Sequence, residues 1–478
     1  MTQTGIVHVA DARNLSMLPD ESVHCVVCSP PYMNLRAYQA GEGEIGREAT
    51  VKEYVNALVT VFREIRRVLR RDGVVWLNLG DSYGRGTRVL NPNDAKRDET
   101  GFQQRISQTG NYGDAQAVLP QKQLMGVPWR VALAMQDDGW FLRADCVWNK
   151  ANSMPSSVED RVTINHEYVF MLTKEPHYWY DFVAILEPLK EVSIKRQMRG
   201  RGTTKYNTND YGQTHHSTLK ARQKRDFVDM DALLQAGELG LHPGGRNKRS
   251  VWTVATSPSA YDFCANCGSL FIGTERKPLR HVVTDERGNE HTEMLPCPCC
   301  GELAWFAHFA PYPRKLIEPA ILAACPPHVC ADCGTPYVRV TEKQSRRESG
   351  SQTRVSCLST KHDQATGRTN GNHAYADPLH EKAVREITTV GWRKACSCAC
   401  TETLPGIVLD PFMGSGTTAM TAEVNHRRWI GIDLNPNCER LTLARIKRLN
   451  DDPQFRTKKK RAPKPAPKPK TAEQASFL

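Results

Sequence analysis

Short apolar runs alternate with stretches of helical periodicity along the first part of the chain. Residues 5–10 and 23–28 are apolar and rich in β-branched side chains, as buried parallel strands are. Between residues 51 and 71 apolar residues recur at helical spacing, and Asp72-Gly73 is expected to end that helix before a third strand at residues 73–79. This alternation predicts an α/β fold with a doubly wound sheet.

The same alternation returns near the C-terminal end of the chain. The further predicted elements are a helix at 122–136, strands at 140–148 and 166–172, a strand at 406–409, a helix at 416–425, a strand at 428–434 and a basic amphipathic helix at 436–449. A chain of 478 residues is too long for one ordinary core, so two or three compact units are expected.

Polar, basic segments interrupt this pattern. Residues 190–248 are poor in apolar side chains, which fits a flexible surface insertion or a lobe that faces DNA, since tyrosines lie among the clustered Arg and Lys. Residues 341–382 form a second polar stretch, interpreted as a loop or a small lobe. The run RTKKKRAPKPAPKPK at 456–470 cannot fold alone, because prolines interrupt it and its charges repel.

Charge and composition narrow the classes of partner. Lys and Arg outnumber Asp and Glu by 64 to 52, a net charge of +12 that favours a polyanion, with nucleic acid ahead of a membrane surface. No window approaches 18 uninterrupted apolar residues, and residues 1–9 do not read as a secretion signal, so we expect a cytoplasmic protein with no membrane partner. Sixteen cysteines in such a chain favour thiols and metal over disulfides.

A proline-rich tetrapeptide, Ser29-Pro30-Pro31-Tyr32, directly follows the predicted strand 23–28. Ligands of an open parallel sheet bind beyond the carboxyl ends of its strands, so chemistry is expected here. The two prolines fix the backbone, which makes Pro30 and its neighbours rigid carbonyl acceptors for an exocyclic amine, and Tyr32 can stack on a base. Taken alone, the tetrapeptide also fits a proline-stiffened turn.

A glycine-rich turn joins a predicted strand to a helix and reads LDPFMGSGTT at residues 409–418. Gly414 and Gly416 let backbone amides approach a ligand closely, and Asp410 can take an amino group. Asp433 ends the next strand, a position from which an acid can accept hydrogen bonds from ribose hydroxyls. The turn alone would also serve NAD, FAD or a nucleotide, but its spacing is not G-x-G-x-x-G and no P-loop lysine follows.

Together, the two motifs resemble those of S-adenosylmethionine-dependent DNA amino-methyltransferases, which methylate the exocyclic amine of cytosine or adenine. Their order in the chain is similar to that of the permuted β class. Asp11 resembles the acid that meets the cofactor adenine in this family. Further similar stretches are Trp148-Asn149-Lys150, Met154-Pro155-Ser156-Ser157-Val158, Asp160-Arg161, His166-Glu167-Tyr168, His308-Phe309-Ala310 and Pro313-Arg314-Lys315-Leu316.

The resemblance implies a Rossmann-like methyltransferase sheet of seven strands with one antiparallel edge strand. The sheet would be circularly permuted, with its first two strands last in the sequence. The two polar insertions and the basic tail lie outside the resemblance, and the full predicted fold adds inserted zinc-ribbon elements, which rest on the cysteines discussed below. Asp81 would either line the cleft or cap the next turn. The implied cofactor contacts are Asp11, Asp410, Phe412, Gly414, Ser415, Gly416, Thr417 and Asp433, and the implied catalytic group is Ser29, Pro30, Pro31 and Tyr32.

The resemblance also implies a mechanism and a partner. The target amine is unreachable inside double-stranded DNA, so the base must flip out, and we expect it to stack on Tyr32. Ser29 Oγ and the Pro30 carbonyl would accept hydrogen bonds from the amine and stabilise its developing positive charge. No metal is needed for this step. A cognate restriction endonuclease is a candidate partner.

The first residue of the tetrapeptide indicates which base is methylated. In this family SPPY is found mostly with cytosine-N4 methylation, while a first residue that is acidic or an amide usually marks adenine. A carboxylate or amide is a stronger acceptor for the adenine amine, and Ser29 offers a smaller, neutral hydroxyl. A hydroxyl can hold either amine, so cytosine N4 is the prediction and adenine N6 the alternative.

Cysteine pairs predict two structural zinc sites. C-x-x-C-G knuckles turn backbone amides onto thiolates, and two knuckles complete a tetrahedral site. The first predicted set is Cys264, Cys267, Cys297 and Cys300, which leaves Cys299 as a spare thiol; the second is Cys330, Cys333, Cys396 and Cys398, with Cys400 as a rival ligand. Cys25 and Cys28 lie within a predicted strand and are interpreted as buried thiols.

The predicted organisation follows from these motifs. It comprises 1–189 as the catalytic half of the methyltransferase domain, 190–250 as a basic insertion for target recognition, 251–305 as a zinc ribbon, 306–329 as a cofactor-side helix, 330–400 as a second zinc-binding insertion, 401–452 as the cofactor-binding half and 453–478 as a basic tail.

Three other functions fit the sequence less well. A zinc-ribbon DNA-binding protein with a non-catalytic core is disfavoured because both motifs are intact. A dehydrogenase on the same sheet does not account for the SPPY tetrapeptide. A zinc deaminase would match His291-Thr292-Glu293 and the cysteines that follow Pro296, but these stretches are too close in sequence to occupy two helices around one metal.

Overall fold

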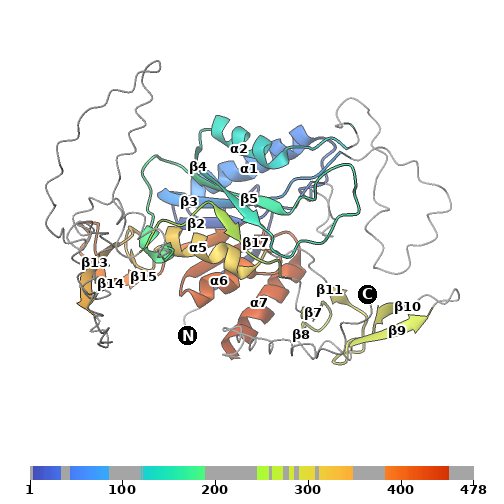
Figure 1. Cartoon of the computed structure of the whole chain (residues 1–478). Helices are drawn as coiled ribbons and strands as arrows, with labels where there is room; N and C mark the ends of the chain where they lie inside the picture. The colour runs from blue at the N-terminus through green and yellow to red at the C-terminus, as the bar shows by residue number, and fades with distance from the viewer. Residues whose placement is uncertain are drawn as a thin grey trace, which may run out of the picture. The chain divides into compact units, whose positions relative to one another are not determined.

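A computed structural model of the whole chain shows its architecture (Figure 1). It describes residues 4–33, 43–84, 120, 122–188, 245–257, 261–272, 279–284, 290–306, 312–347 and 383–451. The chain divides into two compact units, the first comprising Met1–Tyr180, Ser250–Gly334 and Cys400–Leu478, the second Asp181–Arg249 and Thr335–Ala399. None of the helices in the described part of the chain has the length and apolarity that a bilayer crossing requires.

One eight-stranded sheet forms the centre of the first unit. Its order is β1 (Gly5–Val9), β17 (Arg428–Asp433), β16 (Ile407–Asp410), β2 (Val23–Cys28), β3 (Leu69–Leu79), β5 (His166–Thr173), β4 (Phe141–Asn149) and β6 (Val251–Thr253). Strand β5 runs antiparallel to both of its neighbours, and the other neighbouring pairs are parallel. The α/β prediction is confirmed.

Two details of the predicted sheet are wrong. The sheet has eight strands rather than seven, because the short strand β6 pairs with β4. The antiparallel strand is not at an edge, since β5 lies between β3 and β4. The late strands β16 and β17 do lie between β1 and β2, as the predicted chain order requires; circular permutation itself stays a prediction.

The first long helix ends earlier than the sequence predicts. Helix α1 (Val51–Val68) begins with a capping box between Thr50 and Glu53, and Leu69 after it is already extended. Leu69 is fully buried and pairs with Val23 of β2, so β3 starts there rather than after Gly73. Pairing with the sheet and burial of Leu69 outweigh the helical propensity of the Leu-Arg-Arg sequence.

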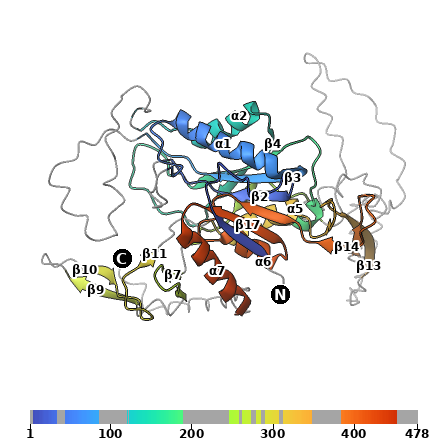
Figure 2. The same cartoon turned by 180° about the vertical axis from the view of Figure 1, so that it is seen from behind.

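Helices cover both faces of the sheet (Figures 1 and 2). Helices α1 and α2 (Val127–Asp137) lie on one face, while α5 (Arg314–Ala324) and α6 (Thr417–Val424) lie on the other. Side chains of β2 alternate between two cores: Val26 and Cys28 pack on the α1 side, and Cys25 and Val27 on the α5 side. Burial on both faces is why this strand is almost continuously apolar.

A small cysteine-bearing sheet packs on the last helix of the first unit. It contains β7 (Tyr261–Cys264), β8 (Leu270–Ile272) and β11 (Trp305–Phe306), and Leu441 of α7 (Pro436–Asp451) shares its core with Tyr261 and Phe263. Two two-stranded pairs complete this unit, β9 (Arg280–Thr284) with β10 (Glu290–Met294) and β12 (Val329–Cys330) with β15 (Thr403–Leu404).

The second unit contains the 3₁₀ helix η2 (Phe182–Ile185) and a hairpin of β13 (Val338–Arg347) and β14 (Ala383–Arg393). An ion pair of 2.5 Å joins Arg339 to Asp181 within it. The predicted loop at 341–382 therefore begins in strand β13. The predicted basic insertion at 190–248 lies almost wholly outside the described residues, as does the tail at 456–470.

Candidate active site and metal site

Two strands that are far apart in sequence bring the two motifs together. Strands β2 and β16 are parallel neighbours, with Cys25 opposite Val408 and Val26 opposite Leu409. Their carboxyl ends therefore meet at one edge of the sheet. The SPPY tetrapeptide at 29–32 follows β2 there, and the glycine turn at 410–417 begins at the end of β16.

Strands β17 and β1 extend this edge. Asp433 ends β17, which pairs with β16 on the side away from β2, and Asp11 follows β1, which pairs with β17. The backbone amide of Ala10 donates to the carbonyl of Asp433 at 3.0 Å. The structure thus places the predicted cofactor residues at or just after the carboxyl ends of β1, β17 and β16, and β16 is the neighbour of the strand that carries the predicted catalytic tetrapeptide.

Groups outside the tetrapeptide hold its backbone. The hydroxyl of Tyr54, on α1, donates to the Pro31 carbonyl at 2.8 Å. Pro30 is buried. A side chain at Gly46, which has a φ of +100°, would meet the Tyr32 carbonyl at 3.1 Å, so a close backbone approach also supports the loop. The prolines are therefore held in place by packing as well as by their own stiffness.

The hydroxyl end of Tyr32 points at a buried carboxylate. Tyr32 Oη donates to Glu167 Oε2 at 2.6 Å, and Ser29 Oγ lies 3.5 Å from the same hydroxyl. Lys150 and Asn78 also contact Glu167. Glu167 and Lys150 lie in stretches that resemble the family, but the sequence predicted no role for them. The available signal was a glutamate that precedes the apolar run YVFML in strand β5, HEYVFMLT.

Positive φ values shape the glycine turn. Gly414 has a φ of +52° and Gly416 one of +76°, a region that L side chains rarely adopt. A β-carbon on Gly416 would lie 2.5 Å from Thr442 Oγ1. The turn therefore also needs glycine because there is no room for a side chain. The Gly414 amide donates to Asp433 Oδ2 at 2.8 Å, which ties the turn to the next strand.

Asp410 is buried beneath this turn. Its Oδ1 accepts from the Phe412 amide at 3.0 Å, and its Oδ2 accepts from the hydroxyls of Thr418 at 2.5 Å and Tyr312 at 3.0 Å. Burial raises the pKa of Asp410 to about 6, although these hydrogen bonds oppose the shift. Both carboxylate oxygens thus hold the turn itself, and a contact from Asp410 to a ligand amino group stays a prediction. The role of Tyr312 was not predicted from the sequence.

The two other acids of the edge differ in environment. Burial raises the pKa of Asp433, which accepts hydrogen bonds from the amides of Gly414 and Asn435. Asp11 forms an ion pair of 2.5 Å with Arg13. Burial alone would raise the pKa of Asp11, but the hydrogen bonds and charge of Arg13 outweigh it and lower that pKa.

Asp81 caps a helix. Its Oδ2 accepts from the Gly126 amide at 3.1 Å, and its Oδ1 accepts from the amides of Val127 and Ser82 at 3.1 and 2.9 Å. The bonds to the Gly126 and Val127 amides satisfy donors at the start of α2 that the helix cannot satisfy internally. Of the two roles that the sequence left open, the structure favours the cap.

The glycine turn has features of a binding site for a polar ligand. The hydroxyl of Thr417 is buried and has no hydrogen-bond partner among the described residues. The left-handed glycines open the backbone beside Asp433, whose carboxylate lies at the carboxyl edge of the sheet. An acid at this place and an open backbone turn fit the ribose and methionine parts of S-adenosylmethionine.

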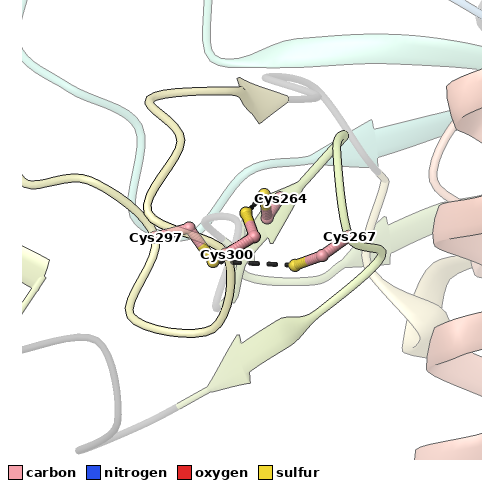
Figure 3. A group of neighbouring side chains, drawn as sticks. All are labelled: Cys264, Cys267, Cys297 and Cys300. Atoms are coloured by element: carbon pink, nitrogen blue, oxygen red, sulfur yellow. Dashed lines mark hydrogen bonds between the residues drawn. The ribbon is translucent and has the colours of Figure 1, made fainter.

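The first predicted cysteine set is assembled in the small sheet (Figure 3). The sulfurs of Cys264 and Cys300 lie 3.7 Å apart, as do those of Cys267 and Cys297. All four lie within 4.8 Å of one another. Tetrahedral zinc with Zn–S bonds of about 2.3 Å places its sulfurs about 3.8 Å apart, so the four thiolates fit this metal.

Both knuckles of this set have the same turn. Gly268 and Gly301 have φ values of +78° and +76°, and their amides donate to the carbonyls of Cys264 and Cys297 at 2.8 Å. Cys299 is exposed and outside the cluster. Arg440 of α7 donates to the carbonyls of the first knuckle, which fixes the cluster against the helix.

The second cysteine set divides between the two units. Cys330 and Cys333 belong to the first, where the Gly334 amide donates to the Cys330 carbonyl at 2.9 Å in a third knuckle turn. Cys396 and Cys398 belong to the second unit. The choice of Cys398 over Cys400 stays a prediction.

The deaminase alternative finds no support in the backbone. His291 and Glu293 lie in strand β10, which pairs with β9, rather than on a helix.

The remaining C-x-x-C pair lies in the main sheet. Cys25 and Cys28 are buried in β2, as expected of structural thiols.

Comparisons with known proteins add to this geometry. The sequence matches the DNA methylase family N6_N4_Mtase over residues 23–333 and 394–444. It is 42% identical over 262 residues to Type II methyltransferase M.Cfr9I of Citrobacter freundii, covering 53% of this chain and 83% of that protein. This chain belongs to the DNA methylase family.

Two further relatives are also Type II methyltransferases, and one of them is similar over most of the chain. Type II methyltransferase M.XycI of Xanthomonas campestris pv. cyanopsidis is 39% identical over 50% of this chain and 78% of its own length. M.SfiI of Streptomyces fimbriatus is 31% identical over 90% of this chain and 88% of its own length. The resemblance to the amino-methyltransferases is thereby confirmed, and the chain is a DNA methyltransferase of the N4/N6 type. A dehydrogenase is excluded.

The glycine turn yields a prediction about stability. Gly416→Ala should lower the free energy of unfolding by about 1–2 kcal/mol for the left-handed backbone, and by about 1–3 kcal/mol more because Thr442 must move. Gly301→Ala is the matched control, since Gly301 has the same φ of +76° with nothing within 4 Å of its added β-carbon. Urea unfolding measures both; equal losses would contradict the close approach to Thr442.

Proposed function

We propose that this DNA methyltransferase transfers a methyl group from S-adenosylmethionine to the N4 amine of a flipped cytosine in double-stranded DNA. The observation that carries the proposal is the parallel pairing of β2 with β16, which puts Ser29-Pro30-Pro31-Tyr32 next to the glycine turn. A methyl acceptor site and a methyl donor site must be adjacent for direct transfer, because the reacting atoms have to meet in line.

The donor site would consist of Asp11, Asp410, Phe412, Gly414, Ser415, Gly416, Thr417 and Asp433. S-adenosylmethionine supplies an electrophilic methyl group on its sulfonium. Asp433 would accept hydrogen bonds from the ribose hydroxyls, and the hydroxyl of Thr417 offers a further polar contact that no described protein group takes up.

The acceptor site would act on the lone pair of the target amine. That lone pair is conjugated with the ring, which makes the amine a poor nucleophile. Hydrogen bonds from the amine to Ser29 Oγ and to the Pro30 carbonyl would favour a pyramidal nitrogen and stabilise its positive charge as the new bond forms. Tyr54 supports this arrangement, since its bond to the Pro31 carbonyl holds the loop before substrate arrives.

The substrate would be a base extruded from the duplex, because the amine cannot be reached inside it. The net charge of +12 favours binding to the DNA backbone. The segments at 190–248 and 456–470 are proposed phosphate contacts. Relatives carry the name Type II methyltransferase, and we infer the same class for this chain, with a cognate restriction endonuclease as partner in the cytoplasm.

Cytosine is favoured over adenine by the residue that opens the tetrapeptide. Ser29 presents a small neutral hydroxyl, where an acidic or amide residue would be a stronger acceptor for the adenine amine. Adenine N6 is the second candidate, since the hydroxyl can accept from either amine.

Mass spectrometry of digested DNA tests the proposed base. DNA from cells that lack their own methylation and express the protein should contain 4-methylcytosine, and cells expressing Ser29→Ala should contain at least about tenfold less because the amine loses an acceptor. Sequencing that detects modified bases would locate the recognition site. Finding 6-methyladenine without 4-methylcytosine would overturn the proposed target base but not the fold.

We also propose structural zinc in this enzyme. The four thiolates of Cys264, Cys267, Cys297 and Cys300 have the spacing of a tetrahedral site, and the second set would be Cys330, Cys333, Cys396 and Cys398. Binding of metal to such a site adds directly to the free energy of folding. The zinc would hold the small sheet together and take no part in methyl transfer.

Elemental analysis tests the metal. The protein should contain about two zinc ions per chain, Cys264→Ser about one, and the control Cys299→Ser the full amount, since Cys299 lies outside the cluster. Cys264→Ser should also melt at a lower temperature. A folded, active and zinc-free preparation would defeat the proposal. A single zinc ion in the wild type would mean that the second cysteine set does not bind zinc.

A further inference from the structure

A buried acid lies beneath the tetrapeptide. Glu167 is only 8% exposed, at the start of β5. Its Oε2 accepts from Tyr32 Oη at 2.6 Å and from Asn78 Nδ2 at 3.1 Å, and its Oε1 pairs with the ammonium of Lys150. Burying a carboxylate is costly unless it is paired and hydrogen-bonded, and here donors from three side chains meet both oxygens.

The donors around Glu167 are themselves held in place. Asn78 lies near the end of β3 and donates a second bond, at 3.0 Å, to the Tyr168 carbonyl. Lys150 follows β4, and its amide donates to the Asn165 carbonyl at 2.8 Å. The carboxylate is thus fixed by groups from strands on both sides of β5, which leaves it little freedom to follow a moving tyrosine.

The ring of Tyr32 fits against a glycine. A β-carbon on Gly80 would lie 2.8 Å from Tyr32 Cε2 and 3.3 Å from the carboxyl carbon of Glu167. Gly80 therefore gives the ring room to reach the carboxylate. Burial, and then the charge of Glu167, raise the pKa of the Tyr32 phenol well above its ordinary value, so the phenol stays protonated and remains the donor.

We propose that Glu167 is a positioning residue for methyl transfer: it anchors Tyr32 by its hydroxyl, so that the ring keeps one orientation for stacking on the flipped base. Lys150 balances the charge of the anchor. Asn78 orients the carboxylate oxygen that Tyr32 uses. This inference rests on the proposed function, in which Tyr32 stacks on the target base, and it adds a role for a residue outside the proposed donor and acceptor sites.

Single-turnover methylation by the full-length enzyme tests this role. The substrate is DNA amplified in vitro, which carries no methylated bases, and the methyl donor is radiolabelled S-adenosylmethionine. Tyr32→Phe and Glu167→Gln should each lower the rate about 10- to 100-fold, as expected for loss of a hydrogen bond to a charged group. Calorimetry should find the affinity for S-adenosylmethionine unchanged within about twofold, because the donor site is untouched.

The double variant separates positioning from general support of the fold. If Glu167 acts through Tyr32, then Tyr32→Phe with Glu167→Gln should be no more than about twofold slower than the slower single variant. If the fold-reductions in rate of the two single variants multiply in the double variant, the inference is overturned. Tyr178→Phe is the control: its hydroxyl accepts a bond of 3.3 Å from Arg143, away from this network, and its loss should leave the rate unchanged.

The remaining outcomes also decide the matter. If Glu167→Gln does not fold, Tyr32→Phe still carries the test, because it leaves Glu167 with Asn78 and Lys150; a wild-type rate in Tyr32→Phe overturns the inference. A wild-type enzyme that transfers no methyl group defeats the proposed function and the inference together. An active wild type with an equally active Glu167→Gln defeats the inference alone.

Discussion

The pairing of β2 with β16 is the constraint on which the rest of the site depends. It joins strands from opposite ends of the chain, with Cys25 opposite Val408. His24 adds a fixed point at the start of β2: its Nδ1 accepts from the Ile407 amide at 3.1 Å, and its Nε2 lies 3.0 Å from the Gly334 carbonyl. Burial lowers the pKa of His24 to about 4, so the imidazole stays neutral and can accept on one nitrogen while it donates from the other.

Three acids serve this edge in different ways: Asp410 and Glu167 are buried, and Asp433 is partly buried. Asp410 holds its own turn, Asp433 joins that turn to the neighbouring strand, and Glu167 holds the tyrosine of the tetrapeptide. In each case hydrogen bonds offset part of the cost of burying the carboxylate. The donor and acceptor sides of the proposed reaction are therefore both organised by the protein before any ligand binds.

Local sequence predicts most helices and strands around the two motifs and the motifs themselves, but it does not predict contacts between distant residues. Strand β2 was predicted residue for residue, since a short run of mostly apolar and β-branched side chains is typical of a strand buried on both faces. The interior place of β5 and the added strand β6 could not be predicted, because both depend on pairing across long insertions. Glu167 meets Tyr32 from 135 residues away, and no local periodicity encodes such a contact.

In the proposed reaction, the glycine turn and Asp433 would bind the methyl donor. Calorimetric titration of the full-length protein with S-adenosylmethionine measures this directly. Asp433→Ala and Gly414→Val should weaken binding at least about tenfold, the loss expected when a hydrogen bond to a charged group is removed or the backbone approach is blocked. The exposed Asp137, changed to Ala, serves as control and should bind like the wild type. Unchanged affinity in both site variants would contradict this donor site.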